Sequence, residues 1–99
     1  MSADIALAYA QRLYRVTLDF ATICEIEDEM GSLGMVYARL TQGAWTAGEL
    51  VSLCHILLAR AGCSCDYMAL GQDMVAQGFE RYRSAVASLL ARVFTTDEG

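Results

Sequence analysis

Proline and lysine are absent from this 99-residue sequence, and histidine and tryptophan each occur once. Without proline, glycine is the main residue that can interrupt a helix. The longest apolar run, residues 50–59, is broken by Ser52 and His55 and is far shorter than the roughly 20 residues that a membrane-spanning helix needs. The amino terminus also lacks the positive charge and the cleavage site of a secretory signal. We therefore expect no membrane contact and a cytoplasmic location.

Basic residues are few, since seven arginines stand against twelve acidic residues and give a formal net charge of −5. A net negative domain repels phosphate backbones at long range. Arg81 and Arg83 flank Tyr82, but two cations make a weak positive patch. We predict that the chain does not bind nucleic acid.

The residues that could ligate a metal or attack a substrate are spaced unfavourably for either task. Cys63 and Cys65 form a C-x-C pair instead of the usual C-x2-C zinc knuckle, and the adjacent Cys54 and His55 point about 100° apart on a helix. Cytoplasmic thiols stay reduced, so we expect no structural disulfide. We predict no metal, no cofactor and no enzymatic activity. A small thiol- or metal-dependent enzyme using these four residues is the alternative.

Residues 4–20 carry two short runs in which apolar residues alternate with small or polar ones, a pattern typical of β-strands. The alternating residues are Ile5, Leu7 and Tyr9 in the first run, and Tyr14, Val16, Leu18 and Phe20 in the second. A helix rich in alanine, leucine and arginine also fits this segment. We favour a hairpin, although its turn lacks the usual Asn-Gly or Asp-Gly pair.

The segment 17–31 leads from the second run into a helix whose two faces differ strongly. Asp19 is predicted to cap its first turn, and Gly31 to end it. We expect Glu25, Asp28 and Glu29 to face solvent. The residues expected on the core side are Phe20, Ile23, Cys24 and Met30, with Ile26 at the edge.

Residues 32–62 are predicted to form two helices. Ser32 caps the first and Gly43 ends it, whereas Thr46 and Glu49 form a capping box at the start of the second. The core-facing residues are expected to be Leu33, Val36, Tyr37 and Leu40 in the first helix, and Leu50, Leu53, Cys54, Leu57, Leu58 and Ala61 in the second. The second helix should be the most buried in the protein.

Residues 66–94 are predicted to form two further helices separated by Gly78, or a single kinked helix. Ser64 or Asp66 caps the start. The core-facing residues are expected to be Tyr67, Leu70, Met74 and Val75 before the glycine, and Phe79, Tyr82, Val86, Leu89, Leu90 and Val93 after it.

These patterns predict a single mainly α domain over residues 1–99. We expect a compact bundle of four to five short helices over residues 20–94, preceded by a small N-terminal β-hairpin over residues 4–20. The last residues, 95–99, are expected to form a frayed tail.

Three segments carry a family resemblance through their order and spacing. They are YRVTLDFATICEIEDEMG at 14–31, LTQGAW at 40–45 leading to TAGELVSLCHILLARAG at 46–62, and MVAQGFERYRSAVASLLARVF at 74–94. Together they resemble the tail assembly chaperone family of long-tailed phages, in particular the small tail-assembly proteins of gene transfer agent and prophage clusters. The resemblance implies a non-enzyme that binds the tape measure protein, assists tail tube assembly and is absent from the mature particle. The tail tube protein is a second implied partner, and self-association stays open.

Trp45 lies between two predicted helices, where a large aromatic residue either fills the core or lies at the rim of a binding groove. An unrelated helical adaptor would use such a groove as well. The candidate partner-binding residues are Trp45, Tyr37, Leu40, Glu25, Asp28 and Glu29.

Overall fold

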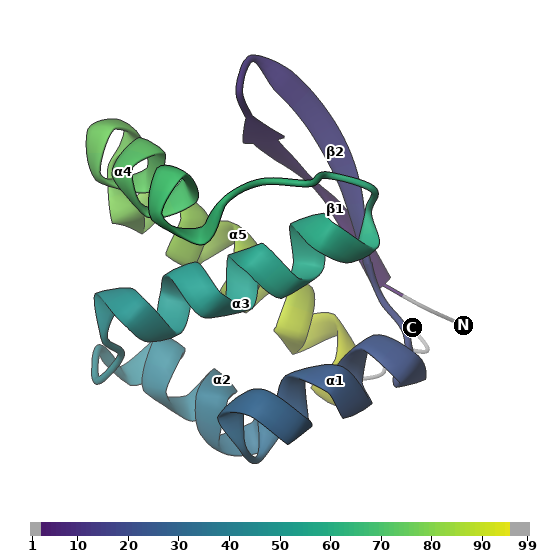
Figure 1. Cartoon of the computed structure of the whole chain (residues 1–99). Coiled ribbons are helices and arrows are strands. Elements are labelled where there is room, and N and C mark those ends of the chain that lie inside the picture. The colour runs from purple at the N-terminus through teal and green to yellow at the C-terminus, as the bar shows by residue number, and fades with distance from the viewer. Residues whose placement is uncertain (1–2, 96–99) are drawn as a thin grey trace.

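The computed structural model describes residues 3–95, which fold as a β-hairpin followed by five helices (Figure 1). The strands are β1 (Ala3–Tyr9) and β2 (Arg12–Leu18). The helices are α1 (Phe20–Met30), α2 (Leu33–Gln42), α3 (Ala47–Arg60), α4 (Tyr67–Gln77) and α5 (Phe79–Phe94). The predicted mainly α fold with an N-terminal hairpin is confirmed. The expected frayed tail falls almost wholly on residues 96–99, which lie outside the described range.

The hairpin pairs Tyr9 with Arg12 across a two-residue turn. The turn residues Ala10 and Gln11 have φ angles of 53° and 64°, the positive values that a tight hairpin turn requires. Leu7, Val16 and Leu18 point into the core and are buried. The helical alternative for this segment is therefore wrong, and the hairpin forms without a glycine in its turn.

Helix α1 begins and ends where its local sequence predicts, but its core face is different. Asp19 accepts hydrogen bonds from the backbone N–H and the hydroxyl of Thr22, at 2.9 and 2.7 Å. This cap holds Thr22 against the core, where it is buried together with Ile26. Phe20 is consequently 78% exposed and Cys24 is also exposed, so their predicted core positions are wrong.

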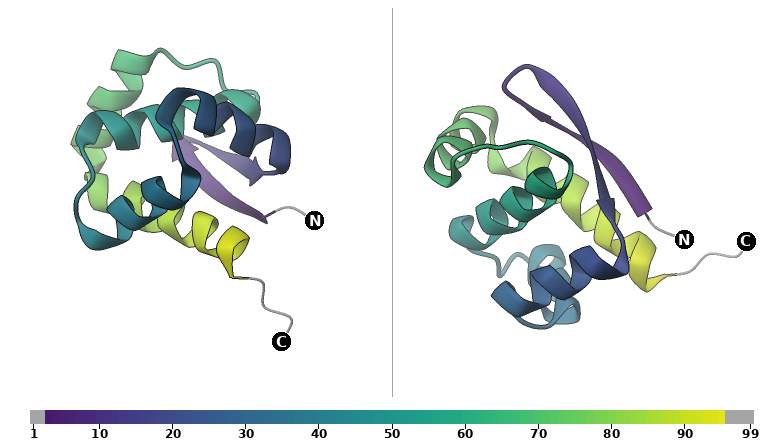
Figure 2. Two further views of the ribbon diagram at one scale, coloured as in Figure 1. Left: turned by 90° about the horizontal axis from the view of Figure 1, so that it is seen from below. Right: turned by 45° about the vertical axis from the view of Figure 1, so that its right-hand side comes forward.

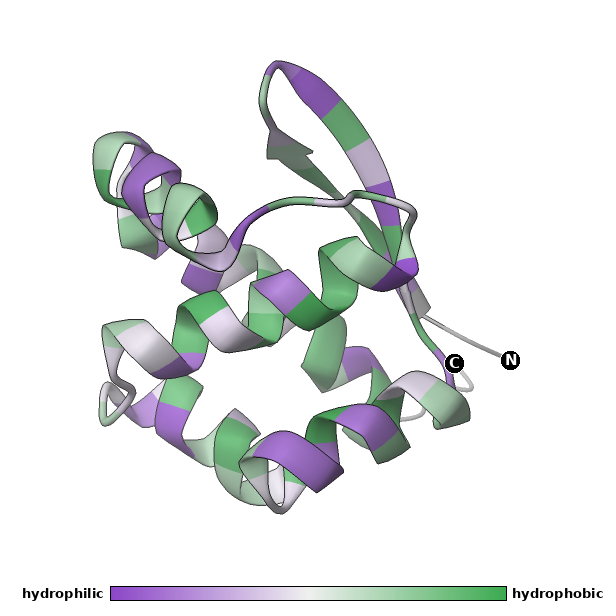
Figure 3. Ribbon diagram, in the orientation of Figure 1, coloured by the Kyte–Doolittle hydropathy of each residue, from purple (hydrophilic) through white to green (hydrophobic). Residues whose placement is uncertain are grey.

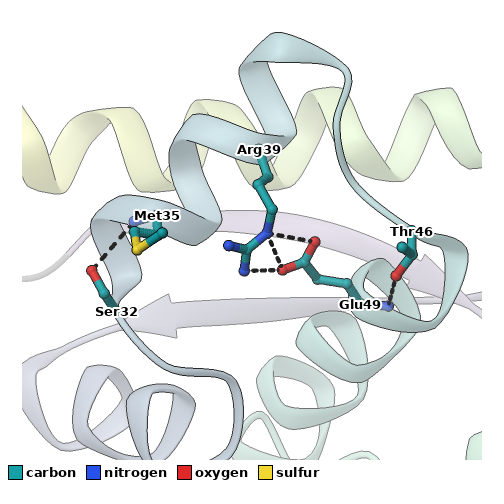
Figure 4. Close-up of polar contacts among 5 residues, drawn as sticks. All are labelled: Ser32, Met35, Arg39, Thr46 and Glu49. Atoms are coloured by element: carbon teal, nitrogen blue, oxygen red, sulfur yellow. Dashed lines mark hydrogen bonds and ion pairs between the residues drawn. The ribbon is translucent and has the colours of Figure 1, made fainter.

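Helices α2 and α3 are linked by an ion pair. It replaces the hydrogen bond that the Glu49 side chain would make in the predicted capping box. The hydroxyl of Thr46 accepts a hydrogen bond from the N–H of Glu49 at 3.1 Å, as predicted (Figure 4). The carboxylate of Glu49, however, accepts from Arg39 Nε of α2 at 2.9 Å. A charge-assisted bond to guanidinium is stronger than one to a neutral backbone N–H, which explains the exchange of partners. Ser32 caps α2 through the N–H of Met35, as predicted.

Helix α3 lies at the centre of the molecule, in contact with β2, α1, α4 and α5. Most of its length is apolar (Figure 3), and its buried residues are Leu50, Val51, Leu53, Cys54, Ile56, Leu57 and Leu58. The prediction that this is the most buried helix is confirmed. Figure 2 shows the other elements arranged around it.

Gly78, with a φ of 97°, separates α4 from α5, so the alternative of one fused helix is wrong. The predicted stripe of α5 is confirmed, with four of its residues buried: Tyr82, Val86, Leu89 and Leu90. Helix α4 is capped by Asp66 and buries only Leu70 and Met74. Tyr67 and Val75, predicted to face the core, are 40% and 61% exposed. None of the helices within residues 3–95 is long and apolar enough to cross a membrane.

Replacing Leu57 by alanine should lower the free energy of unfolding by roughly 2–5 kcal/mol, because Leu57 is fully buried and truncation leaves a cavity. Urea denaturation measures the change. Leu13→Ala is the matched control, since Leu13 is 75% exposed and its truncation should cost no more than about 0.5 kcal/mol. Equal effects of the two substitutions would contradict the central position of α3.

Replacing Thr46 by alanine should cost about 1 kcal/mol, because the first turn of α3 loses its cap. The midpoint of urea denaturation reports this loss. Thr41→Ala provides the control, since the hydroxyl of Thr41 donates back to carbonyl groups within α2 and caps no helix. If both variants keep the wild-type midpoint, the hydroxyl of Thr46 does not stabilise α3.

Candidate partner-binding groove

An open apolar groove runs between the first turns of α3 and the outer face of α4. It has a volume of about 220 Å³, below the roughly 300–1,000 Å³ typical of small-molecule pockets, so its size suits side chains of a partner better than a substrate. Apart from the amide of Gln72 and the hydroxyl of Tyr67, the side chains that line it are apolar. The groove is lined by Ala47, Gly48 and Val51 of α3, by Tyr67, Met68, Gly71, Gln72 and Val75 of α4, and by Phe79 of α5.

Small residues form the floor of the groove. Gly71 faces Val51, and a Cβ atom added at Gly71 would lie 3.8 Å from both Val51 methyl groups. Gly48 faces Tyr67 in the same way, with 3.8 Å between an added Cβ and the phenol oxygen. Because no side chain projects from either glycine, the space between α3 and α4 stays open.

Large apolar side chains form the walls and are unusually exposed. Met68 and Val75 are 67% and 61% exposed, and Tyr67 is 40% exposed. The hydroxyl of Tyr67 donates to the carbonyl of Gly48 at 3.3 Å and lies 3.5 Å from the hydroxyl of Ser52. These contacts hold the ring across the groove, while Met68 remains free to adapt to different shapes.

Trp45 supports one end of the groove without lining it. Its ring packs edge-on against Phe79, with 6.1 Å between the ring centroids and 66° between the planes. Trp45 is partly buried against the core. Trp45 thus packs onto the core and contacts a residue that lines the groove, while its role in partner binding stays a prediction.

The other candidate binding residues lie on α1 and α2, away from the groove. Leu40 is fully buried, so it is removed from the candidate surface. Tyr37 is partly buried and stacks on Phe94 with ring centroids 5.2 Å apart. Glu25 forms an ion pair with Arg60 at 2.9 Å. The remaining two candidates, Asp28 and Glu29, are exposed on α1.

The sequence contains a pattern that indicates the groove. The prediction that Tyr67 and Val75 face the core obscured this pattern. Met68, Gly71 and Val75 follow each other at the i, i+3 and i+7 spacing of one helix face. Leu70 and Met74 occupy a different face and are fully buried. Helix α4 thus has two apolar stripes, of which the one with Leu70 and Met74 is buried and the one with Met68 and Val75 is exposed.

The alternative of a thiol- or metal-dependent enzyme depends on Cys54, His55, Cys63 and Cys65. Within residues 3–95, no group of three or more His, Cys, Asp and Glu side chains is arranged to hold a metal ion. Burial raises the pKa of Cys54 to about 12, and burial together with the nearby Cys63 raises the pKa of Cys65 to about 11. Both thiols therefore stay protonated near neutral pH, where a thiolate would be needed for nucleophilic attack or metal ligation. The Nε2 atom of His55 lies 2.9 Å from the carbonyl of Cys65.

The raised pKa of Cys54 predicts a loss of stability at alkaline pH. Below the ordinary thiol pKa of 9.0, the thiol is protonated in the folded and unfolded chain alike, and its contribution is fully present. Between pH 9 and about 12 only the unfolded chain releases this proton, so the free energy of unfolding should fall by up to about 1.4 kcal/mol per pH unit. Urea denaturation across this range should show a shallower fall for Cys54→Ala than for the wild type. Cys24→Ala is the control, because it removes an exposed thiol and leaves Cys54 in place.

Comparison with known proteins places this fold in a family of tail proteins. Residues 2–96 match the family described as phage tail tube protein, GTA-gp10. No curated protein and no solved structure matches the chain. The family is one of phage and gene transfer agent tails and is not a class of enzymes. Since the match spans nearly all of the sequence, the chain belongs to the phage tail tube protein, GTA-gp10 family.

Proposed function

We propose that this protein is a tail assembly chaperone that binds apolar helical segments of the tape measure protein in the groove between α3 and α4. The observation that carries this proposal is the concentration of exposed apolar side chains at one place. Tyr67, Met68 and Val75 line one groove although each is at least 40% exposed. An exposed apolar surface of this kind is typical of a protein-interaction site.

The groove has the chemistry needed to hold a helix reversibly. A helix presents large side chains at i, i+3, i+4 and i+7, and these can enter a groove whose floor is made of glycine and alanine. Met68 adapts to different apolar shapes because its side chain is unbranched and polarizable. Such a surface suits a chaperone that covers many similar segments of one long partner.

The charge of the chain supports the same role. A net charge of −5 keeps separate molecules apart and favours solubility, including when an apolar partner segment is bound. The acidic residues Asp28 and Glu29 remain exposed on α1, outside the groove. We propose that the protein works in the cytoplasm of the host cell, where tails are assembled.

Met68→Ser should weaken binding of a purified tape measure fragment at least about tenfold, because the largest exposed groove contact is removed. Isothermal titration calorimetry measures the affinity. Met35→Ser is a closely matched control, since Met35 is 61% exposed but lies on α2 outside the groove. Equal losses in both variants would argue against the groove.

Gly71→Ala tests the groove with a change that should not unfold the protein. Alanine at this position within α4 should stabilise the helix by up to about 1 kcal/mol, while its methyl group occupies the groove floor near Val51. Higher stability with weaker binding is the expected result. Unchanged binding would show that the partner does not enter the groove.

The description of the family favours a second function, a component of the tail tube itself. Purified mature particles distinguish the two functions. A chaperone is absent from them, whereas a tube component is present in many copies and can be detected by quantitative mass spectrometry. Detection at a copy number similar to that of the tube would replace the chaperone proposal.

A further inference from the structure

The two outer edges of the hairpin carry different sets of backbone groups. In an antiparallel ladder, residues alternate between pairs that are hydrogen-bonded to each other and pairs whose N–H and C=O groups point outward. Since Tyr9 and Arg12 flank the two-residue turn, they form a hydrogen-bonded pair. The outward groups therefore belong to Asp4, Ala6 and Ala8 on β1, and to Leu13, Arg15 and Thr17 on β2.

Helix α5 closes the β1 edge. The hydroxyl of Tyr82 donates to the carbonyl of Ala8 at 3.3 Å, and Arg92 Nη1 donates to the carbonyl of Asp4 at 2.7 Å. Helix α5 also packs directly against β1. Another strand cannot add to this edge without displacing both side chains.

The β2 edge is open in the described part of the chain. No residue within 3–95 forms a hydrogen bond to the outward backbone groups of Leu13, Arg15 or Thr17. The side chain of Arg15 is 75% exposed, and Leu13 is exposed to the same extent. The turn end of the hairpin extends beyond the helices in Figure 1 and in the right-hand view of Figure 2.

An unpaired edge of this kind is a template for an extended peptide. We propose that β2 binds an extended segment of a partner protein as a third strand, with an apolar residue facing Leu13 and a carboxylate facing Arg15. The hairpin contains two arginines and one aspartate, so it carries a net positive charge within a strongly acidic chain. Within residues 3–95, Arg15 forms an ion pair only with the exposed Asp4, at 3.2 Å, and its guanidinium has donors left for a second carboxylate.

A second copy of the chain fits this edge less well. Antiparallel pairing of the two open edges over residues 13–17 would place Arg15 directly opposite its counterpart, and like charges at directly opposed positions destabilise a sheet. The site does not overlap the α3–α4 groove and does not depend on the function proposed for it.

Amide hydrogen exchange of the ¹⁵N-labelled full chain tests the proposal. The probe is the peptide acetyl-Thr-Thr-Glu-Thr-Val-Thr-amide, which places glutamate opposite Arg15 and valine opposite Leu13 in an antiparallel third strand. In the free protein, the amides of Leu13, Arg15 and Thr17 should exchange fast. Saturating peptide should slow their exchange at least about tenfold, because each amide becomes paired or shielded.

Two control peptides separate strand pairing from unspecific binding. A peptide methylated on the backbone nitrogens of glutamate and valine should lose binding, because it cannot donate to the edge. A peptide with lysine in place of glutamate should bind about threefold more weakly, and this preference should disappear in Arg15→Gln. Arg15→Gln should fold normally, since it removes only an exposed ion pair.

Four results would overturn the proposal. The three amides could exchange slowly without peptide at every protein concentration, which would mean that the edge is closed within the chain. Protection that rises with protein concentration alone would assign the edge to a second copy. Equal binding of the methylated peptide, or no slowing of exchange by saturating peptide, would exclude strand addition.

Discussion

The structure depends on covering α3, because apolar residues occupy nearly its whole circumference. Leu53 and Leu57 are fully buried, and so are Cys54 and Leu58 on neighbouring faces of the same helix. No single neighbour can cover such a surface, so β2, α1, α4 and α5 each contact a different part of it. The ion pair of Arg39 with Glu49 joins α2 to the start of α3. The other elements are therefore positioned by the helix that they cover.

The hairpin shows how this packing overrides local preference. A two-stranded hairpin is marginally stable by itself, and its turn has Ala10 and Gln11 at positive φ, where glycine or asparagine is usual. Burial of Leu7 and Val16, together with the hydrogen bond of Tyr82 to Ala8, supplies the stabilisation from outside the hairpin. The hydrogen bond of Tyr82 also helps to close the β1 edge.

Local chemistry explains which features could be predicted from the sequence. The caps at Asp19, Ser32 and Thr46 need only groups within three residues of each other, and all three are present. The predictions that failed depended on distant residues. The carboxylate of Glu49 binds Arg39, which lies ten residues earlier and on another helix. Phe20 is exposed because α1 is oriented with the polar Thr22 toward the core. Apolar content alone does not predict this orientation.

The candidate groove was hidden because apolar residues at helical spacing were assigned to the core. Helix α4 packs against α3 and α5 but buries only Leu70 and Met74. The second stripe, with Met68 and Val75, must then remain exposed or bind another molecule. Glycine at position 71 leaves the space beside Val51 unfilled, although alanine would fit there and would favour the helix. Glycine at position 71 thus lowers the stability of α4 and leaves an apolar face exposed. Binding of a partner explains this combination better than folding does.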